Sequence, residues 1–186
     1  MGEAIMKFRR WIVRLLAALM ILIPLTATAL YFVNPFGALS NDPRQRIFGY
    51  GPYRIPSRSM SPTVHPDQIV VVNAGYYRKH PPQRGDIVTF IHPEDGNTWI
   101  KRVVGLPGES IGIEDGVVVV DGNRLTEDYL LADNVVTEYS REMPAEVVPE
   151  NSYFLLGDNR DNSEDARIFG ATRREDIGGK VVLIFK

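Results

Sequence analysis

A serine and a lysine are the two residues of this chain whose types and surroundings could support chemistry. Ser59 lies in the hydroxyl-rich stretch Ile55–Thr63 (IPSRSMSPT), and some forty residues later Lys101 lies in the run Trp99–Val104 (WIKRVV). A serine hydroxyl attacks only when a base accepts its proton, and a lysine is that base only when its amine is uncharged. The pair could therefore form a hydrolase that needs no histidine.

The charge of Lys101 is the condition on which this chemistry depends. Lowering a lysine pKa from about 10.4 to about 7 takes roughly 4–5 kcal/mol. Burial among apolar side chains can supply this free energy, because it penalises the charged ammonium form. In a strand, Trp99 and Val103 would share the face of Lys101. Taken singly, neither residue indicates catalysis, because most lysines lie at the surface and serines in turns usually bond their own backbone.

Composition excludes several other kinds of function. The 186 residues carry 21 basic and 23 acidic side chains, a net charge of −2, which is not the balance of a nucleic-acid-binding protein. The absence of cysteine excludes thiol catalysis, disulfides and thiolate metal sites. The three histidines, His65, His80 and His92, lack the short spacing of metal ligands. We therefore expect no metal and no cofactor.

The N-terminal region has the composition of a membrane anchor. Leu15–Val33 is free of charge, and as a helix it would span ~28 Å, close to the ~30 Å hydrocarbon core of a bilayer. Four basic residues precede it: Lys7, Arg9, Arg10 and Arg14. We expect residues 1–33 to be a cytoplasmic N-terminus and transmembrane helix of the inner (plasma) membrane, with the rest on the periplasmic or extracellular side. The alternative is a cleaved signal, since Ala27–Ala29 has the small-x-small pattern of a cleavage site.

Beyond the span, the sequence predicts a linker over residues 34–46 and one β-rich catalytic domain over 47–186. Short β-branched runs separated by turn signals predict a mainly β fold, an antiparallel sheet or barrel-like arrangement without a helix of ordinary length. The predicted strands are 68–73, 86–91, 99–104, 110–113, 117–120, 153–156 and 180–185. The dipeptides Asp115-Gly116 and Asp121-Gly122 are strong hairpin signals, which indicates a small β-hairpin excursion within approximately 105–156.

Four stretches, in order along the chain, resemble the successive boxes of type I signal peptidases, also called leader peptidases. They are Ile55–Thr63, Gly85–Val88 (GDIV), Ile100–Glu109 (IKRVVGLPGE) and Gly157–Arg167 (GDNRDNSEDAR). The resemblance runs from about Ile55 to the C-terminus and does not account for the linker or for residues 123–149. It implies a membrane-anchored serine endopeptidase with a Ser/Lys dyad, and a reduced accessory β segment compared with members that carry long insertions.

The resemblance also implies roles by position. Ser59 would attack the scissile carbonyl with Lys101 as its general base. Ser57 would donate its hydroxyl to the oxyanion beside the backbone N–H of Ser59, and Ser163 would hydrogen-bond and orient the lysine amine. Ion-paired residues that hold the site together would be Asp158, Asp165 and Arg167.

The implied function is removal of signal peptides from exported preproteins after a small-x-small motif, with preproteins and membrane lipid as partners. Two alternatives stay open. The short segment between Lys101 and Gly157 also suits a specialised processing peptidase of a pilin-like or conjugative-transfer subunit, and a non-catalytic, membrane-tethered β-domain could bind extended peptides. Arg58 departs from the small residue common in the family at that position, which could alter the substrates that fit.

Overall fold

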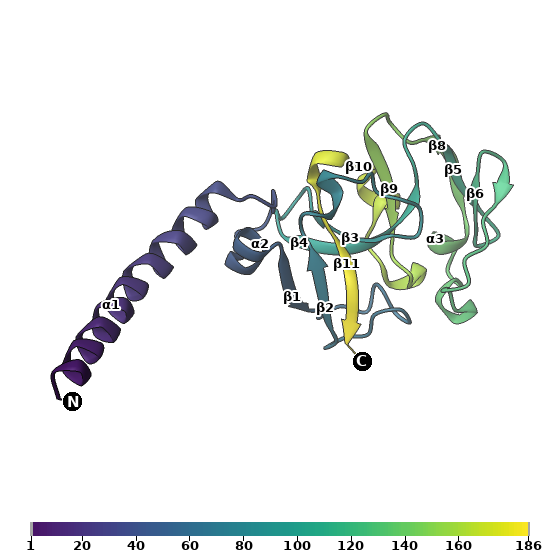
Figure 1. The fold of residues 1–186 in the computed structure, drawn as a ribbon. Helices are drawn as coiled ribbons and strands as arrows, with labels where there is room; N and C mark the ends of the chain where they lie inside the picture. Colours follow the sequence, from purple (N-terminus) through teal and green to yellow (C-terminus); the bar gives the residue numbers. More distant parts are fainter. Residues whose placement is uncertain (1, 186) are drawn as a thin grey trace.

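A computed structural model describes residues 2–185, and it separates a single long helix from a β-rich body (Figure 1). Helix α1 (Gly2–Val33) projects away from the strands, and Glu3–Val33 is long and apolar enough to cross a membrane. None of the most apolar part of this helix is buried against the rest of the chain. The exposure of so many apolar side chains indicates that a lipid environment surrounds the helix.

The segment predicted as a linker, residues 34–46, is structured in part. Helix α2 (Pro43–Phe48) begins where the Asp42 carboxylate accepts a hydrogen bond from the Arg44 N–H, and it ends at Gly49, whose φ is 80°. A side-chain cap followed by proline is a strong helix start, and a left-handed glycine is a common stop. Ala38 and Gln45 are buried, so this segment packs against the domain that follows.

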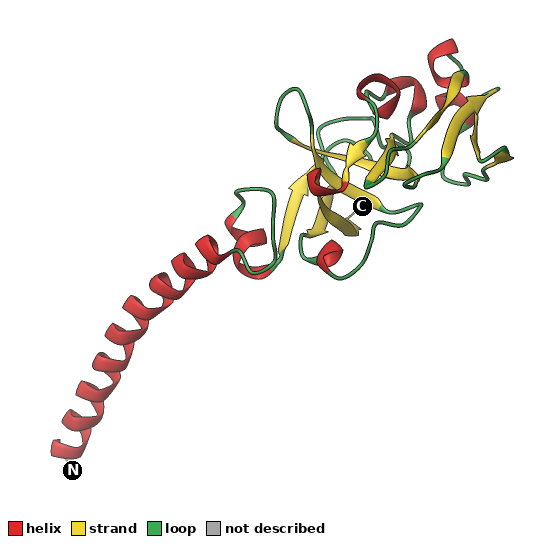
Figure 2. Cartoon of the chain, turned by 90° about the horizontal axis from the view of Figure 1, so that it is seen from above, coloured by secondary structure: helices red, strands yellow, loops and turns green. Residues whose placement is uncertain are grey.

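The larger of two antiparallel sheets has seven strands in the order β1-β2-β11-β3-β4-β9-β10 (Figures 1 and 2). Its strands are β1 (Tyr50–Arg54), β2 (Ile69–Asn73), β3 (Ile87–Ile91), β4 (Thr98–Gly105), β9 (Ser152–Leu156), β10 (Thr172–Arg173) and β11 (Ile177–Phe185). Strand β9 pairs with β4 only from Arg102 onward. The first half of β4 therefore has a main-chain edge that no strand of this sheet covers.

The smaller sheet has the order β7-β6-β5-β8 and is the excursion predicted within 105–156. Its strands are β5 (Ser110–Glu114), β6 (Val117–Val120), β7 (Asn123–Arg124) and β8 (Met143–Val147). The Asp-Gly pairs at 115–116 and 121–122 all have positive φ, between 49° and 79°, as two-residue hairpin turns require. The remaining helical turns are short: η1 (Tyr76–Arg78), η2 (Ala132–Asn134), α3 (Glu138–Arg141), η3 (Arg160–Asn162), α4 (Ala166–Phe169) and η4 (Arg174–Asp176).

These elements confirm the predicted mainly β fold. Each of the seven predicted strands is present within a few residues of its expected bounds, and β11 begins three residues earlier than predicted. Four strands were not predicted. Strands β7 and β10 have only two residues each, too few to show a pattern, and the sequences of β1 and β8, YGPYR and MPAEV, contain proline and lack an alternating apolar pattern.

The core consists of three clusters that meet around β4. Ile100 belongs to the cluster that also contains Met60 and Val64, whereas Val103 belongs to a second cluster that Trp99 covers. The third cluster joins the two sheets through Val104, Ile111, Ile113, Val118, Val120, Val148, Phe154, Leu156 and Ala166. Close packing on both faces holds β4 in a fixed position, including the side chain of Lys101.

Candidate active site

Ser59 lies in a turn that is anchored by apolar side chains. Met60 and Val64 are fully buried, the Val64 N–H donates to Met60 O (2.8 Å), and the Ser61 N–H donates to Arg58 O (3.0 Å). The backbone of Ser59 is also fixed, since its carbonyl accepts the Asn159 N–H at 3.0 Å. The turn therefore presents the Ser59 hydroxyl in one direction, with the residue only 8% exposed.

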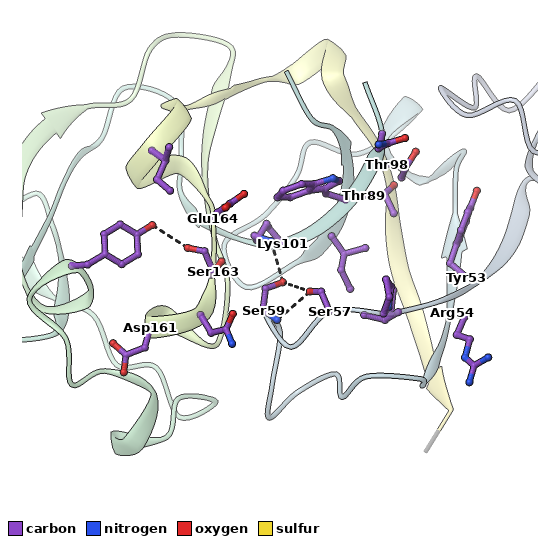
Figure 3. Close-up of a pocket in the computed structure, with 18 residues that line it drawn as sticks. Tyr53, Arg54, Ser57, Ser59, Thr89, Thr98, Lys101, Asp161, Ser163 and Glu164 are labelled. Carbon is purple, nitrogen blue, oxygen red and sulfur yellow. Dashed lines mark hydrogen bonds between the residues drawn. The ribbon is translucent and has the colours of Figure 1, made fainter. Parts of the chain in front are cut away.

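Strand β4 brings Lys101 directly to this hydroxyl. Lys101 is 2% exposed, and its Nζ lies 3.1 Å from Ser59 Oγ (Figure 3). The Trp99 ring lies 5.1 Å from the same nitrogen, as two residues on one strand face should. The structure thus places the predicted nucleophile and base in hydrogen-bonding contact.

The environment of Lys101 favours its uncharged form. Burial lowers the pKa of Lys101 from 10.5 to about 8, although the nearby carboxylates of Asp165, Glu164 and Asp158 act in the opposite direction. The pKa is lowered because desolvation penalises the ammonium form more than the amine. A neutral amine is therefore accessible at only mildly alkaline pH, as the predicted chemistry requires.

Ser57 is beside the nucleophile but is not free to receive an oxyanion in this structure. Its Oγ lies 2.9 Å from Ser59 Oγ and accepts a hydrogen bond from the Ser59 N–H at 3.2 Å. The two expected oxyanion donors therefore engage each other. A rotation of the Ser57 side chain would release both donors toward a substrate carbonyl.

Ser163 faces the same cavity as the dyad, from the opposite wall to Ser57 (Figure 3). The hydrogen bond expected between its hydroxyl and the Lys101 amine is not formed, and Ser163 Oγ is buried without a partner among residues 2–185. Gly157 allows this approach: a Cβ on Gly157 would lie 2.2 Å from Ser163 Oγ and 2.6 Å from Ser59 O. Only glycine therefore fits at position 157, next to the segments that carry Ser59 and Ser163.

Asp158 forms a buried ion pair that the sequence did not reveal in full. Its two carboxylate oxygens accept from Arg102 Nε (2.8 Å) and Nη2 (2.6 Å), and the side chains of Asp158 and Arg102 are 1% and 9% exposed. Arg102 also donates to Thr63 Oγ1 and Gly85 O. This bidentate pair, with the two further bonds of Arg102, therefore joins all four boxes beside Lys101.

Asp165 and Arg167 form a second bidentate pair. Arg167 Nε and Nη2 each donate to the Asp165 carboxylate at 2.8 Å, and Asp165 also accepts the Gly157 N–H at 3.0 Å. The Arg167 guanidinium lies 4.1 Å from the Tyr139 ring centre, and the Tyr139 hydroxyl donates to Ser163 O. The pair therefore fixes the backbone on both sides of Ser163.

Sequence reasoning missed several residues of this site. Arg102 and Arg160 lie inside the recognised boxes and could have been named as partners of the acidic residues. Glu127, Tyr129 and Tyr139 come from the stretch 123–149, whose weak pattern gives no local signal of proximity to the dyad.

A cavity of about 850 Å³ opens beside the dyad. One wall comes from residues 53–57 and the other from 161–164, with Thr98–Lys101 between them. Within residues 2–185 the structure has no group of three His, Asp or Glu side chains that could hold a metal ion. Ser59 and the uncovered part of β4 both line this cavity, so it can hold an extended peptide against the strand edge and past Ser59.

Sequence and structure comparisons relate this chain to known proteins. The profile of the family described as "Signal peptidase, peptidase S26" matches residues 37–186. Probable signal peptidase I-1 of Synechocystis sp. is 38% identical over 148 residues, which cover 75% of this chain and 73% of that protein. Signal peptidase IB of Staphylococcus aureus is 31% identical over 147 residues, 72% of this chain and 76% of that protein. The crystal structure of a signal peptidase I from Enterococcus faecalis aligns with a TM-score of 0.47 and 35% identity, over 55% of this chain and 98% of that one.

Proposed function

Because this chain belongs to the signal peptidase family, peptidase S26, we propose that Ser59 is its nucleophile and Lys101 its general base. As members of this family do, the chain works as a serine endopeptidase that removes signal peptides from preproteins. The observation that carries the residue assignment is the 3.1 Å contact between Ser59 Oγ and a Lys101 amine that is 2% exposed. A lysine can act as the base only when its nitrogen contacts the serine hydroxyl and when burial keeps that nitrogen uncharged.

The reaction then proceeds in two steps. Ser59 Oγ attacks the scissile carbonyl carbon while its proton passes to Lys101 Nζ, and the ammonium returns that proton to the leaving nitrogen as the C–N bond breaks. Lys101 next takes a proton from water, which attacks the carbonyl carbon of the Ser59 ester, and the ammonium returns that proton to Ser59 Oγ as the C–O bond breaks and the acid product leaves. Ser163 is the second group that we assign to the amine: its unpartnered Oγ can hydrogen-bond the lysine nitrogen and orient it toward Ser59.

The substrate is proposed to lie extended between the two cavity walls. Residues 98–101 of β4 can pair main chain with main chain, since β9 begins to cover that edge only at Arg102. Shallow pockets along such a strand admit small side chains and reject large ones, which suits a small-x-small motif.

The charge of the oxyanion is proposed to be stabilised by the Ser57 hydroxyl and the Ser59 N–H. Replacing Ser57 by alanine is expected to lower kcat by about 10²–10³-fold with little change in KM, because such a donor bonds the oxygen mainly after it becomes charged. Steady-state cleavage of a preprotein measures both constants. Ser61→Ala, on the same turn but outside the cavity, is the control; a Ser57→Ala enzyme with the kcat of that control would exclude the oxyanion role.

The chain is membrane-anchored, and we propose that α1 crosses the bilayer once with its N-terminus in the cytoplasm. The basic residues before the span support this orientation: Lys7, Arg9, Arg10 and Arg14. The catalytic domain would then act on the periplasmic or extracellular side, where signal peptides emerge. Residues 1–33 would be the anchor and 47–186 the catalytic domain, with an accessory β segment within about 105–156.

Cleavage of a purified preprotein with an Ala-x-Ala site tests the function. The full-length protein in detergent should release the mature protein with the amino terminus that follows the motif, and Ser59→Ala should release none. The alternatives of a specialised pilin-processing peptidase and of a silent binding domain are not favoured, because the relatives are named signal peptidases I. Cleavage of one pilin-like substrate alone would restore the first alternative, and binding without turnover the second.

A further inference from the structure

A buried carboxylate outside the recognised boxes pairs with an arginine of the last box. Glu127 and Arg160 form an ion pair at 2.6 Å, with side chains 3% and 0% exposed. Glu127 belongs to residues 125–131, the segment that leads from β7 of the smaller sheet to η2, where the Asn134 side chain donates to Ser61 O. We call residues 125–131 the accessory segment. It lies within residues 123–149, a stretch that the family resemblance does not account for and that the proposed mechanism does not use.

Tyr129 extends the contact from the accessory segment to a second arginine. Its hydroxyl donates to Glu127 Oε1, and its ring centre lies 3.8 Å from the Arg102 guanidinium carbon. Burial and the adjacent Glu127 carboxylate raise the pKa of the Tyr129 phenol, which therefore stays protonated as a donor. Glu127 and Tyr129 together thus contact both arginines that flank the dyad.

Arg160 transmits the position of Glu127 to the nucleophile. Its Nε donates to Gly157 O at 3.0 Å, and Gly157 is the residue that leaves no room for a side chain next to Ser163 Oγ and Ser59 O. Because Gly157 lies close to both residues, a displacement of Gly157 toward them would push Ser59 or Ser163 out of place. The Asn159 N–H on Ser59 O couples the same loop to the nucleophile a second time.

Arg102 transmits the position of Tyr129 to the base. Arg102 follows Lys101 on β4 and is held from one side by Asp158, while the Tyr129 ring covers its guanidinium. An arginine packed against an aromatic face is fixed in orientation and protected from water. The Tyr129 contact thereby helps keep water from the strand that carries Lys101.

We propose that Glu127 and Tyr129 are positioning residues that lock the Gly157–Ser163 loop and β4 into the geometry of the Ser59/Lys101 dyad. They touch no reacting atom and act through Arg160 and Arg102. Without the Glu127 charge, Arg160 would be a buried cation held only by a carbonyl, and the loop would shift to give it water. The inference rests on the proposed function, since it concerns the rate of that cleavage.

Glu127→Gln tests the proposal because glutamine keeps the shape of the side chain and removes its charge. We expect kcat for preprotein cleavage to fall about 10–100-fold with KM within about 2-fold, since a misplacement of about 1 Å can cost two orders of magnitude. The acidic limb of the pH–kcat profile should also move to higher pH, because water reaching the amine lets the Lys101 pKa return toward its ordinary value. The matched control is Asp128→Asn, an exposed carboxylate on the same segment.

The outcomes separate the proposal from its premise. If the wild-type protein does not cleave the preprotein, the proposed function fails. If the wild type cleaves, two results would overturn the positioning role. Either Glu127→Gln has the kcat of Asp128→Asn, or its kcat falls while the acidic limb of the pH–kcat profile stays at the wild-type pH. Should Glu127→Gln fail to fold, Tyr129→Phe decides: it removes one hydroxyl only, and we expect a several-fold loss of kcat with the same shift of the limb, whereas wild-type kinetics would overturn the proposal.

Discussion

Replacing Lys101 by methionine is expected to lower kcat for preprotein cleavage by about 10⁴-fold or more, because no other base lies within hydrogen-bonding distance of Ser59 Oγ among the described side chains. Methionine fills a similar volume without a basic nitrogen. It also removes the buried amine, so the variant should unfold at a temperature no lower than the wild type. Steady-state cleavage together with a thermal melt separates loss of chemistry from loss of fold.

The matched control for this substitution is Lys79→Met, at an exposed lysine. It makes the same chemical change outside the cavity and should leave kcat at the wild-type value. A Lys101→Met enzyme that retains more than about one hundredth of the wild-type kcat would mean that another group takes the proton, since general base catalysis alone contributes about 10²–10⁴-fold. The dyad assignment would then be wrong.

Asp158→Ala is expected to cost about 3–5 kcal/mol in the free energy of unfolding, because it leaves Arg102 as a buried cation without its carboxylate. Gly85 O and Thr63 Oγ1 would be the remaining acceptors of that guanidinium, and neither carries a charge. The effect is measured as the difference between urea unfolding curves of the full-length variant and the wild type.

Glu175→Ala provides the comparison, because Glu175 pairs with Arg173 and their side chains are 69% and 67% exposed. Exposed ion pairs contribute little to stability, so this variant should unfold like the wild type. An Asp158→Ala protein as stable as Glu175→Ala would show that the buried pair does not hold the boxes together.

Much of the fold follows from local patterns that the sequence displays directly. The Asp-Gly hairpins and the β-branched strands are present because positive φ and pleated, half-buried surfaces select those residues. Strands β1 and β8 were harder to predict, since pairing with a neighbour rather than their own pattern makes them strands. Helix α2 begins with a recognisable start signal, Asp42-Pro43. Its six residues are too few to show the periodic apolar pattern by which helices are predicted.

The dyad could be named from the sequence only with the help of a family resemblance. Neither Ser59 nor Lys101 is unusual locally, and the dryness of Lys101 comes from cavity walls that are distant in the chain. The resting contact of Ser57 with Ser59 and the unpartnered Ser163 hydroxyl depend on side-chain rotation, which residue order does not encode. The proximity of Glu127 and Tyr129 to the site could not be predicted for a related reason, because an irregular segment brings them there.

The pH dependence of kcat/KM tests most directly whether Lys101 is kept dry and uncharged within reach of Ser59. We expect the rate to rise with pH along a single limb whose midpoint lies near pH 8, because burial lowers the pKa of the base to about 8 and only its neutral form accepts the Ser59 proton. Lys79→Met should show the same limb. A limb that reaches its midpoint only near 10.5, the ordinary lysine value, or a rate independent of pH across this range, would contradict the assignment of Lys101 as the base.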